Sequence, residues 1–241
     1  KADGRQMARL GAGGHLAPNR NDSYYSSVVS FRGMRMVMFI AELNGLKLEA
    51  GDVGNAYLES YAREKCCFVA GPEFKAYGHE GHMMLIDKAL YGMETSGISY
   101  HNLFAQVMLS MGFWPSKADS DIWMRDKDDH YEYLCVYVDD YIYAGKDPDG
   151  FHESLRTLNF KLKGCGEPKY HLGGDFGRVK YSDGKTYLTW GARTYITKRM
   201  MATYKTLYGD LPPKTKQHNP LELDETDLCS DDEKQVYCIL I

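Results

Sequence analysis

Two adjacent carboxylates stand between two apolar runs near the middle of the chain. The hexapeptide YVDDYI, residues 137–142, lies within YEYLCVYVDDYIYAG, residues 131–145. Two apolar runs separated by two residues are typical of a β-hairpin, and Asp is common in turns. Asp-Asp is nevertheless a poor two-residue hairpin turn, because the favoured turns need positive φ and usually contain Asn-Gly or Asp-Gly. Since a departure from a local rule often marks a functional residue, an ordinary turn and a chemical site both stay open.

A third carboxylate, Asp52, follows a segment that alternates between apolar and charged residues. This alternation, over residues 46–50, predicts a strand that runs into Asp52. If the strand lies beside the hairpin, Asp52 meets Asp139 and Asp140 at one edge of a sheet. The alternative is that Asp52 ends its strand in a turn and stays distant from Asp139.

Three clustered carboxylates point to metal-dependent phosphate chemistry. Like charges repel, so such a cluster is costly unless a cation neutralises it. Carboxylate oxygens suit Mg²⁺, which completes its coordination shell with water and substrate phosphates, and Mn²⁺ is expected to substitute for it. Two such ions about 4 Å apart can bind both the attacking and the leaving oxygen of an in-line phosphoryl transfer.

The elements expected around these carboxylates are of mixed type. Ser30 is a suitable N-cap and Gly45 a suitable C′ residue for a first helix. The predicted helices cover residues 31–44, 100–111, 151–160 and 193–204, further strands cover 7–11, 83–86, 170–179 and 186–190, and loops cover 71–82 and 211–232. This order predicts an α+β fold with helices on one face of an antiparallel sheet.

Bulk composition limits the classes of protein and of site. The chain has 241 residues, 44% hydrophobic and 26% charged, which is ordinary for a globular protein. A net charge of −4 argues mildly against a strong non-specific affinity for nucleic acid, and no apolar run approaches the roughly 18 residues of a membrane span.

The six cysteines form no C-x-x-C motif or disulfide framework, which favours a reducing compartment. The spacing of Cys66, Cys67, His79 and His82 does not favour zinc, and GAGGH, residues 11–15, does not match a dinucleotide site.

An ordered set of motifs resembles one enzyme family. YVDD between apolar flanks resembles the catalytic hairpin of reverse transcriptases, and DVGNAY, residues 52–57, resembles their first aspartate motif. Further blocks resemble the copia-type branch of LTR retrotransposons: MARLGAGGH (7–15), YSSVVS (25–30), PEF (72–74), ALYGMETSGISY (89–100), GFWPSKADSDIW (112–123) and GEPKYHLGGDF (166–176). They occur in the order found in that family and cover nearly the whole chain.

The resemblance implies an RNA-directed DNA polymerase with a right-hand fold of fingers, palm and thumb. The implied parts are partial fingers (1–45), a palm (46–190) with an inserted fingers segment (about 61–98), and the start of a truncated thumb (191–241).

The resemblance also implies roles for single residues. Asp52, Asp139 and Asp140 would be catalytic, and together with Val53 they would bind two Mg²⁺ ions. Nucleotide binding falls on Arg9, Val53, Gly54, Tyr57, Thr95, Ser96 and Tyr137. Backbone N–H groups of Val53 and Gly54 would face the triphosphate, and Tyr57 would exclude a ribose 2′-hydroxyl. Lys169 is a candidate general acid, and His171, Leu172, Gly173 and Gly174 resemble the primer grip.

Several departures from the family pattern keep a second hypothesis open. Thr95-Ser96-Gly97-Ile98 stands where the family usually has Gln-Ala-Pro-Arg, and Met7 and Gly13 replace usual lysines. The alternative is therefore a decayed or domesticated remnant that folds, and binds nucleic acid at most, without polymerising. A palm-fold nucleotide cyclase is disfavoured because GGDF, residues 173–176, lacks the second acid and aligns with the primer-grip block.

The resemblance also implies partners and a location. The expected partners are an RNA template with a DNA primer and a deoxynucleoside triphosphate, with no membrane. The resemblance further implies that the sequence begins after the usual leading segment of the family and does not extend to the RNase H and integrase segments of the polyprotein. The expected location is intracellular, in a cytoplasmic retrotransposon particle or the nucleus.

Overall fold

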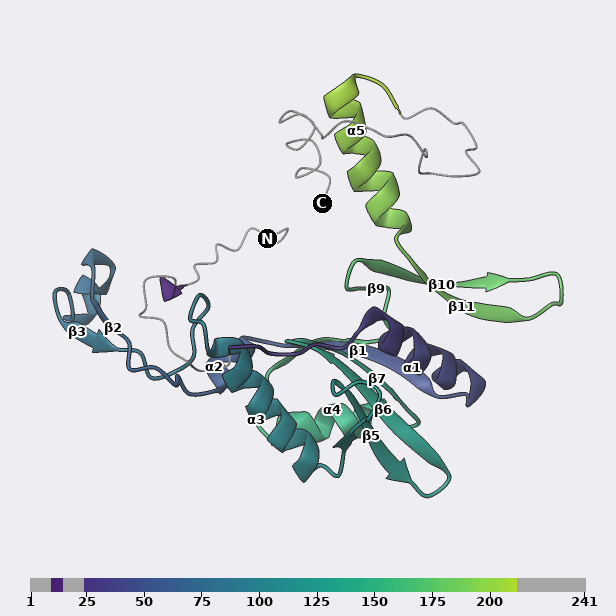
Figure 1. Cartoon of the computed structure of the whole chain (residues 1–241), viewed down its shortest axis with the longest axis horizontal. Helices are drawn as coiled ribbons and strands as arrows, with labels where there is room; N and C mark the ends of the chain where they lie inside the picture. Colours follow the sequence, from purple (N-terminus) through teal and green to yellow (C-terminus); the bar gives the residue numbers. More distant parts are fainter. Residues whose placement is uncertain (1–9, 15–23, 212–241) are drawn as a thin grey trace, which may run out of the picture. The chain divides into compact units, whose positions relative to one another are not determined.

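A computed structural model describes residues 10–14 and 24–211 of the chain (Figure 1). The chain divides into two compact units. The first unit spans residues 1–167 and the second residues 168–241. The first contains α1 (Phe31–Leu43), β1 (Lys47–Val53), α2 (Ala56–Glu59), β2 (Cys67–Val69), η2 (Pro72–Tyr77), β3 (Met83–Leu85), α3 (Ser96–Ser110), β4 (Trp114–Pro115), β5 (Ile122–Lys127), β6 (His130–Tyr137), β7 (Asp140–Gly145), α4 (Pro148–Thr157) and β8 (Leu162–Gly166).

A six-stranded sheet forms the centre of the first unit. Its strand order is β4-β5-β6-β7-β1-β8, and each neighbouring pair is antiparallel. The predicted hairpin is β6–β7, and the predicted strand before Asp52 is β1, which lies between β7 and β8. The antiparallel sheet predicted from the sequence is therefore confirmed.

One face of this sheet packs on α3 and α4. Side chains of alternate strand residues, such as Leu134 and Tyr143, are fully buried there. They pack with Phe104 and Met108 of α3 and with Phe151 of α4 in one hydrophobic core. Because side chains alternate across a strand, the residues between them point to the opposite face.

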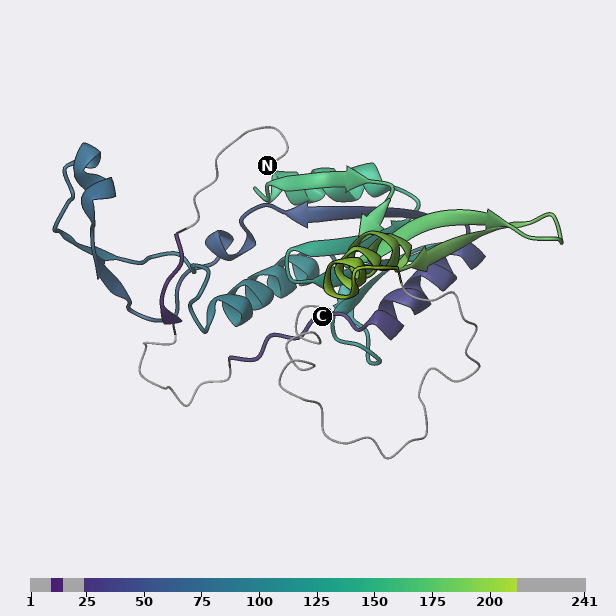
Figure 2. The same cartoon turned by 90° about the horizontal axis from the view of Figure 1, so that it is seen from above.

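The opposite face is covered by α1, which corrects the expectation of helices on one face only. Ile122, Cys135, Ile142 and Ala50 are paired in register across four strands and are buried. The apolar side of α1 contacts β1, β6 and β7, and Gly33 of the helix lies close to Ile122. Figure 2 shows α1 and α4 on opposite sides of the sheet. The reason lies in β6 and β7, whose buried residues other than Glu132 are apolar on both faces, so each face needs a covering layer.

The limits of the elements follow local capping signals. The Ser30 Oγ accepts a hydrogen bond from Gly33 N at 3.0 Å and begins α1, and Gly45, with φ of 62°, follows its end. The expected loop over residues 71–82 contains the short 3₁₀ helix η2, which starts at Pro72. Helix α3 starts at Ser96, earlier than predicted, because Thr95 and Ser96 are buried and hydrogen-bonded.

The second unit holds a small sheet and a helix. Its elements are β9 (Tyr170–His171), β10 (Gly174–Lys180), β11 (Thr186–Gly191), the π-helical segment η3 (Tyr195–Met200) and α5 (Met201–Tyr208). The single strand predicted over residues 170–179 is instead two strands, because Leu172 and Gly173 adopt positive φ and form a turn. The predicted loop over 211–232 and the predicted strand over 7–11 lie almost wholly outside the described residues.

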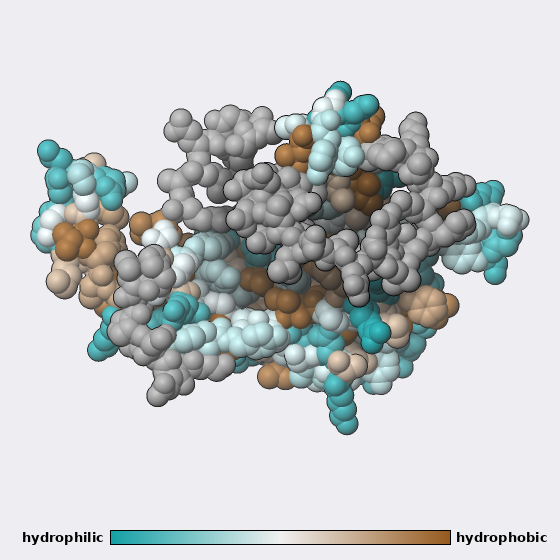
Figure 3. Space-filling view, turned by 45° about the horizontal axis from the view of Figure 1, so that its top comes forward, coloured by the Kyte–Doolittle hydropathy of each residue, from teal (hydrophilic) through white to brown (hydrophobic). Residues whose placement is uncertain are grey.

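Apolar side chains also reach the surface. Val69, Met83 and Leu85 of the β2–β3 hairpin are exposed, and brown surface is visible on this lobe at the left of Figure 3. Within residues 10–14 and 24–211, no helix combines the length and the apolarity needed to cross a membrane.

Candidate active site

The register of the sheet brings the three aspartates to one edge. Asp52, near the end of β1, is paired directly with Asp140, the first residue of β7. The N–H of Val53 donates a hydrogen bond of 2.8 Å to the carbonyl oxygen of Asp139. Directly paired residues of antiparallel strands point to the same face, so Asp52 and Asp140 share a face and Asp139 adjoins them. The alternative in which Asp52 stays distant from Asp139 is excluded.

The turn of the hairpin consists of Val138 and Asp139, and not of the two aspartates. Tyr137 is paired with Asp140 across the turn. Val138 has φ of 57°, in the left-handed region that β-branched residues rarely adopt. Backbone strain of this kind persists where the surroundings impose it, and it is found at functional sites. The interpretation of Asp-Asp as the turn is therefore wrong by one residue.

Burial and neighbouring charges shift the ionisation of Asp52 and Asp140. Burial, and then the charge of Asp139, raises the pKa of Asp52, while Lys163 opposes the shift. Burial, with the charges of Asp139 and Asp52, raises the pKa of Asp140 to about 6. The cluster thus carries negative charge that Lys163 compensates only in part, and a bound cation would neutralise the remainder.

The donor set suits Mg²⁺ held by a pair of carboxylates. Within the part of the chain that the structure describes, no three His, Cys, Asp or Glu side chains converge closely enough to hold a metal ion together, and this applies to the three aspartates as well as to Cys66, Cys67, His79 and His82. Mg²⁺ is commonly held by one or two carboxylates and completes its shell with water and substrate phosphates. Asp52 and Asp139 supply oxygen ligands alone, so they fit that description.

Lys163 is a charged neighbour of the cluster that the sequence analysis missed. It is paired with Asp52 across β1 and β8. Its Nζ extends over Gly54, where an added Cβ would lie only 2.8 Å from that nitrogen. The sequence does contain a pattern that predicts this strand, because apolar and basic residues alternate in FKLKG, residues 160–164, after a predicted helix. The predicted general acid, Lys169, belongs to the second unit.

The predicted phosphate-facing N–H groups have other partners. Val53 N is bonded to Asp139 O, and Gly54 N donates 2.7 Å to Lys161 O. Both donors complete the edge of the sheet, so they do not face an open site in this conformation. This corrects the expectation for the two N–H groups, and the lack of a Cβ at Gly54 matters here because it leaves room for Lys163.

Tyr57 lies beside the carboxylates at the start of the short helix α2. The chain turns into α2 at Asn55, which has φ of 60°. The Tyr57 ring is half-buried and lies 4.8 Å from the Tyr91 ring and 6.3 Å from the Tyr100 ring, between centroids. Burial, with Asp139 and Tyr91, raises the pKa of Tyr57. Its position is therefore next to the site and not inside the core.

The other predicted nucleotide-binding residues differ in their surroundings. Thr95 Oγ1 donates to Glu64 at 2.5 Å and Ser96 Oγ donates to Leu90 O at 2.6 Å, and both residues are buried. These hydroxyls thus organise the turn before α3. Tyr137 is half-buried beside Asp140, and Arg9 lies outside the described residues.

The residues predicted as primer grip form a turn within the second unit. His171 and Gly174 are paired across the turn at Leu172 and Gly173, with φ of 45° and 81°. His171 is buried, and this burial lowers its pKa to about 4. Trp190 Nε1 donates to His171 O at 3.3 Å, and an added Cβ at Gly174 would collide with the Trp190 ring. The turn is therefore held by a close contact that requires glycine.

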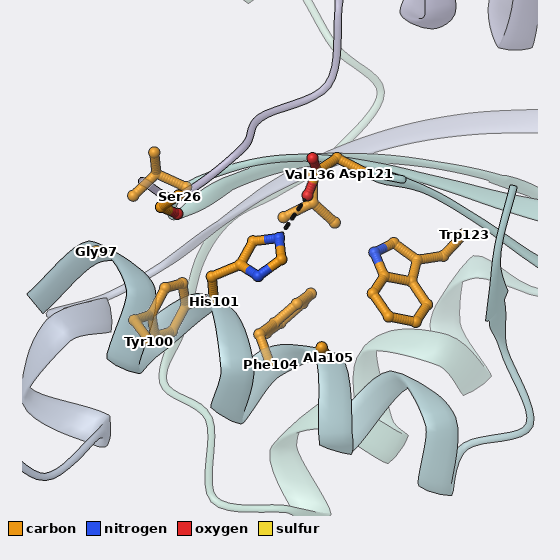
Figure 4. Close-up of a pocket in the computed structure, with 10 residues that line it drawn as sticks. Ser26, Gly97, Tyr100, His101, Phe104, Ala105, Asp121, Trp123 and Val136 are labelled. Carbon is orange, nitrogen blue, oxygen red and sulfur yellow. Dashed lines mark hydrogen bonds and ion pairs between the residues drawn. The ribbon is translucent and has the colours of Figure 1, made fainter. Parts of the chain in front are cut away.

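A small cavity behind the hairpin turn contains a second polar cluster (Figure 4). Its volume is about 10 Å³, and His101 of α3 points across it to Asp121, with Nε2 and Oδ1 2.7 Å apart. Ser27 Oγ lies 3.5 Å from the same Nε2. A Ser-His-Asp triad uses the two different ring nitrogens, so this arrangement is a structural tie and not a nucleophile.

Comparison with known proteins gives a consistent family assignment. The family described as reverse transcriptase (RNA-dependent DNA polymerase) matches residues 1–187. A retrovirus-related Pol polyprotein from transposon RE1 of Arabidopsis thaliana is 27% identical over 220 residues, covering 88% of this chain and 15% of that protein. A Pol polyprotein from transposon TNT 1-94 of Nicotiana tabacum is 25% identical over 156 residues, covering 63% of this chain and 12% of that protein. The chain thus spans about a seventh of the curated relatives that it matches.

Proposed function

Because the chain belongs to the reverse transcriptase (RNA-dependent DNA polymerase) family, we propose that it extends a DNA primer on an RNA template as one segment of a copia-type Pol polyprotein. The observation that carries this proposal is the direct pairing of Asp52 with Asp140, beside Asp139. The substrates are a deoxynucleoside triphosphate and the primer 3′-hydroxyl. The remaining Pol segments are the expected partners, and the expected setting is a retrotransposon particle or the nucleus.

In the proposed reaction, the residues of the cluster position the reacting atoms. Asp52 and Asp139 would hold the cations, and the carbonyl of Val53 and the Asp140 carboxylate would complete the protein ligands. When bound, two Mg²⁺ ions would stabilise the attacking 3′-oxygen and the charge of the triphosphate. The 3′-oxygen forms a bond to the α-phosphorus while the bond from that phosphorus to the bridging oxygen breaks, which releases pyrophosphate. The 3′-hydroxyl proton passes to solvent.

Lys163 is the lysine that the geometry favours for the leaving group. Its ammonium lies beside Asp52 and Gly54, where the phosphates of a metal-bound nucleotide would lie. There it would neutralise pyrophosphate and donate a proton to it. Lys169 remains the prediction made from the sequence. Single-turnover extension by Lys163→Met and Lys169→Met variants decides between them, since only the variant of the acting lysine should be slow.

Primer extension tests the function directly. The protein is given an RNA template, a labelled DNA primer and deoxynucleotides with Mg²⁺ or Mn²⁺. The Asp139→Asn variant should be inactive, and Asp128→Asn should be active, because Asp128 is an exposed carboxylate in the β5–β6 turn. Extension that survives Asp139→Asn would overturn the proposed site.

A specific observation supports the second candidate, a remnant that binds primer–template without extending it. The Val53 and Gly54 N–H groups and the Thr95 and Ser96 hydroxyls all have intramolecular partners. Donors already occupied in this way are poor contacts for a nucleotide. A gel-shift measurement on the same primer–template separates the two functions, because the remnant binds it and leaves the primer at its original length.

A further inference from the structure

Three tyrosines from separate segments meet beside the carboxylates, and we call them the tyrosine cluster. Tyr57 belongs to α2, Tyr100 to α3, and Tyr91 to the turn that precedes α3. The Tyr57 ring is tilted by 51° to the ring of Tyr91 and stands edge-on to that of Tyr100. Aromatic rings at these separations attract one another beyond the effect of area burial. The orientation of Tyr57 is therefore determined from two sides.

A close backbone contact determines the position of Tyr91. Ala12 N donates to Tyr91 O at 2.7 Å, and Gly14 N donates to Gly92 O at 3.0 Å. An added Cβ at Gly14 would lie 2.0 Å from Gly92 O, so only glycine permits this approach. The GAGG segment that has no dinucleotide role thus holds the Tyr91 backbone in place.

The Tyr100 side chain is buried although its hydroxyl group forms no hydrogen bond among the described residues. Only 2% of its surface is exposed. Tyr143, which is fully buried in the same core, donates instead to Glu132 at 2.6 Å. Leaving a buried hydroxyl unpaired is unfavourable, and such costs are typical of residues retained for function.

We propose that Tyr91 and Tyr100 are positioning residues that determine sugar selectivity, because their rings hold Tyr57 in the orientation that excludes a ribose 2′-hydroxyl. The proposal rests on the proposed polymerase function and on the predicted role of Tyr57. Selectivity by a clash needs a rigid ring, since a ring free to rotate would admit the larger sugar. The cluster supplies this rigidity through two ring contacts and one backbone clamp.

Nucleotide incorporation by ring-removing variants tests the proposal. Tyr91→Leu and Tyr100→Leu keep an apolar side chain but lose the ring contact to Tyr57. Each should raise ribonucleotide relative to deoxynucleotide incorporation by roughly two- to tenfold, the factor that corresponds to one aromatic pair. Tyr91→Phe and Tyr100→Phe keep the rings, so the ratio should stay at the wild-type value, and Tyr100→Phe should not lower the melting temperature.

Tyr143→Leu is the matched control for general loosening of the core. It removes a buried ring that does not touch Tyr57, so it should lower the melting temperature without changing the incorporation ratio. The proposal is overturned if Tyr57→Ala changes the ratio while Tyr91→Leu and Tyr100→Leu leave it unchanged, or if Tyr143→Leu changes it equally. Absence of any primer extension by the wild-type protein would instead overturn the proposed function on which it rests.

Discussion

At the scale of single residues, the Asp139 carboxylate combines a half-buried turn position with two acidic neighbours. Burial raises the pKa of both Asp52 and Asp140, and the charge of Asp139 raises them further, so removal of this charge relieves repulsion in the metal-free protein. We therefore expect Asp139→Asn to melt at the same temperature as the wild type, or higher, without metal. Thermal melts followed by circular dichroism test this. A strongly lowered melting temperature would mean that Asp139 is needed for the turn itself.

Tyr57 gives a second prediction at this scale. Its ring is half-buried and packs at the border of the core, so Tyr57→Ala should cost less than the roughly 3–5 kcal/mol of a fully buried aromatic. If Tyr57 selects the sugar, the same variant should incorporate more ribonucleotide relative to deoxynucleotide. Measurements of both incorporation rates and of urea unfolding separate the outcomes. An unchanged ratio with a large loss of stability would make Tyr57 a core residue.

At the scale of elements, the β6–β7 turn stores strain at Val138. A β-branched residue in the left-handed region costs roughly 1–2 kcal/mol. Val138→Gly should remove this cost and raise the free energy of unfolding, measured in urea. The matched control is Val69→Gly on the exposed strand β2, which should be destabilising because glycine weakens a strand. A loss of stability in both variants would show that the Val138 side chain contributes more packing than strain.

The outer strands depend on a buried ion pair. Glu132 of β6 is 2% exposed, and its carboxylate accepts hydrogen bonds from Arg125 at 2.7 Å and from Tyr143 at 2.6 Å. Arg125→Met leaves the buried Glu132 carboxylate without its cation, so it should lower the free energy of unfolding by about 3–5 kcal/mol. The double variant Arg125→Met/Glu132→Leu should lose less. Equal losses in the single and double variants would mean that packing, and not charge, dominates.

At the scale of the whole first unit, His101 and Asp121 tie the segment before α1 to α3 and β5. The hydrogen bond to Asp121 raises the pKa of His101 above its usual 6.5. Burial opposes ionisation of Asp121, but hydrogen bonds from His101 and Ser27 keep its pKa below 3.8. The ion pair between His101 and Asp121 therefore stabilises the folded state at pH 4 to 6.5. This stabilisation is lost as the pH rises through the folded-state pKa of His101.

The pH dependence of melting temperature checks this tie. The wild type should lose more stability than His101→Gln between pH 6 and pH 9, because only the wild type carries the titrating imidazole at this position. The difference between the two curves isolates His101 from other histidines, such as His152 and His171, whose pKa values are lowered by burial. Parallel curves would show that the ion pair contributes no net stability.

The local sequence determined the elements that carry the candidate site. The alternation over residues 46–50 located β1, the apolar arms around YVDD located β6 and β7, and Ser30 and Gly45 located the ends of α1. These features depend on short-range periodicity and capping, which neighbouring residues decide by themselves. The family motifs, read in order, led to the family that the comparison also identifies.

Only the tertiary structure decided how these elements combine. The pairing of β1 between β7 and β8 set Asp52 opposite Asp140 and brought Lys163 to the cluster, because register is a contact between distant segments. In the same sheet, the N–H groups of Val53 and Gly54 donate hydrogen bonds to backbone carbonyls, whereas the motif alone had predicted that they face the triphosphate. The position of α1 on the second face and the placement of the turn at Val138 followed from packing and strand pairing across the whole sheet. No local pattern in the sequence contains these contacts.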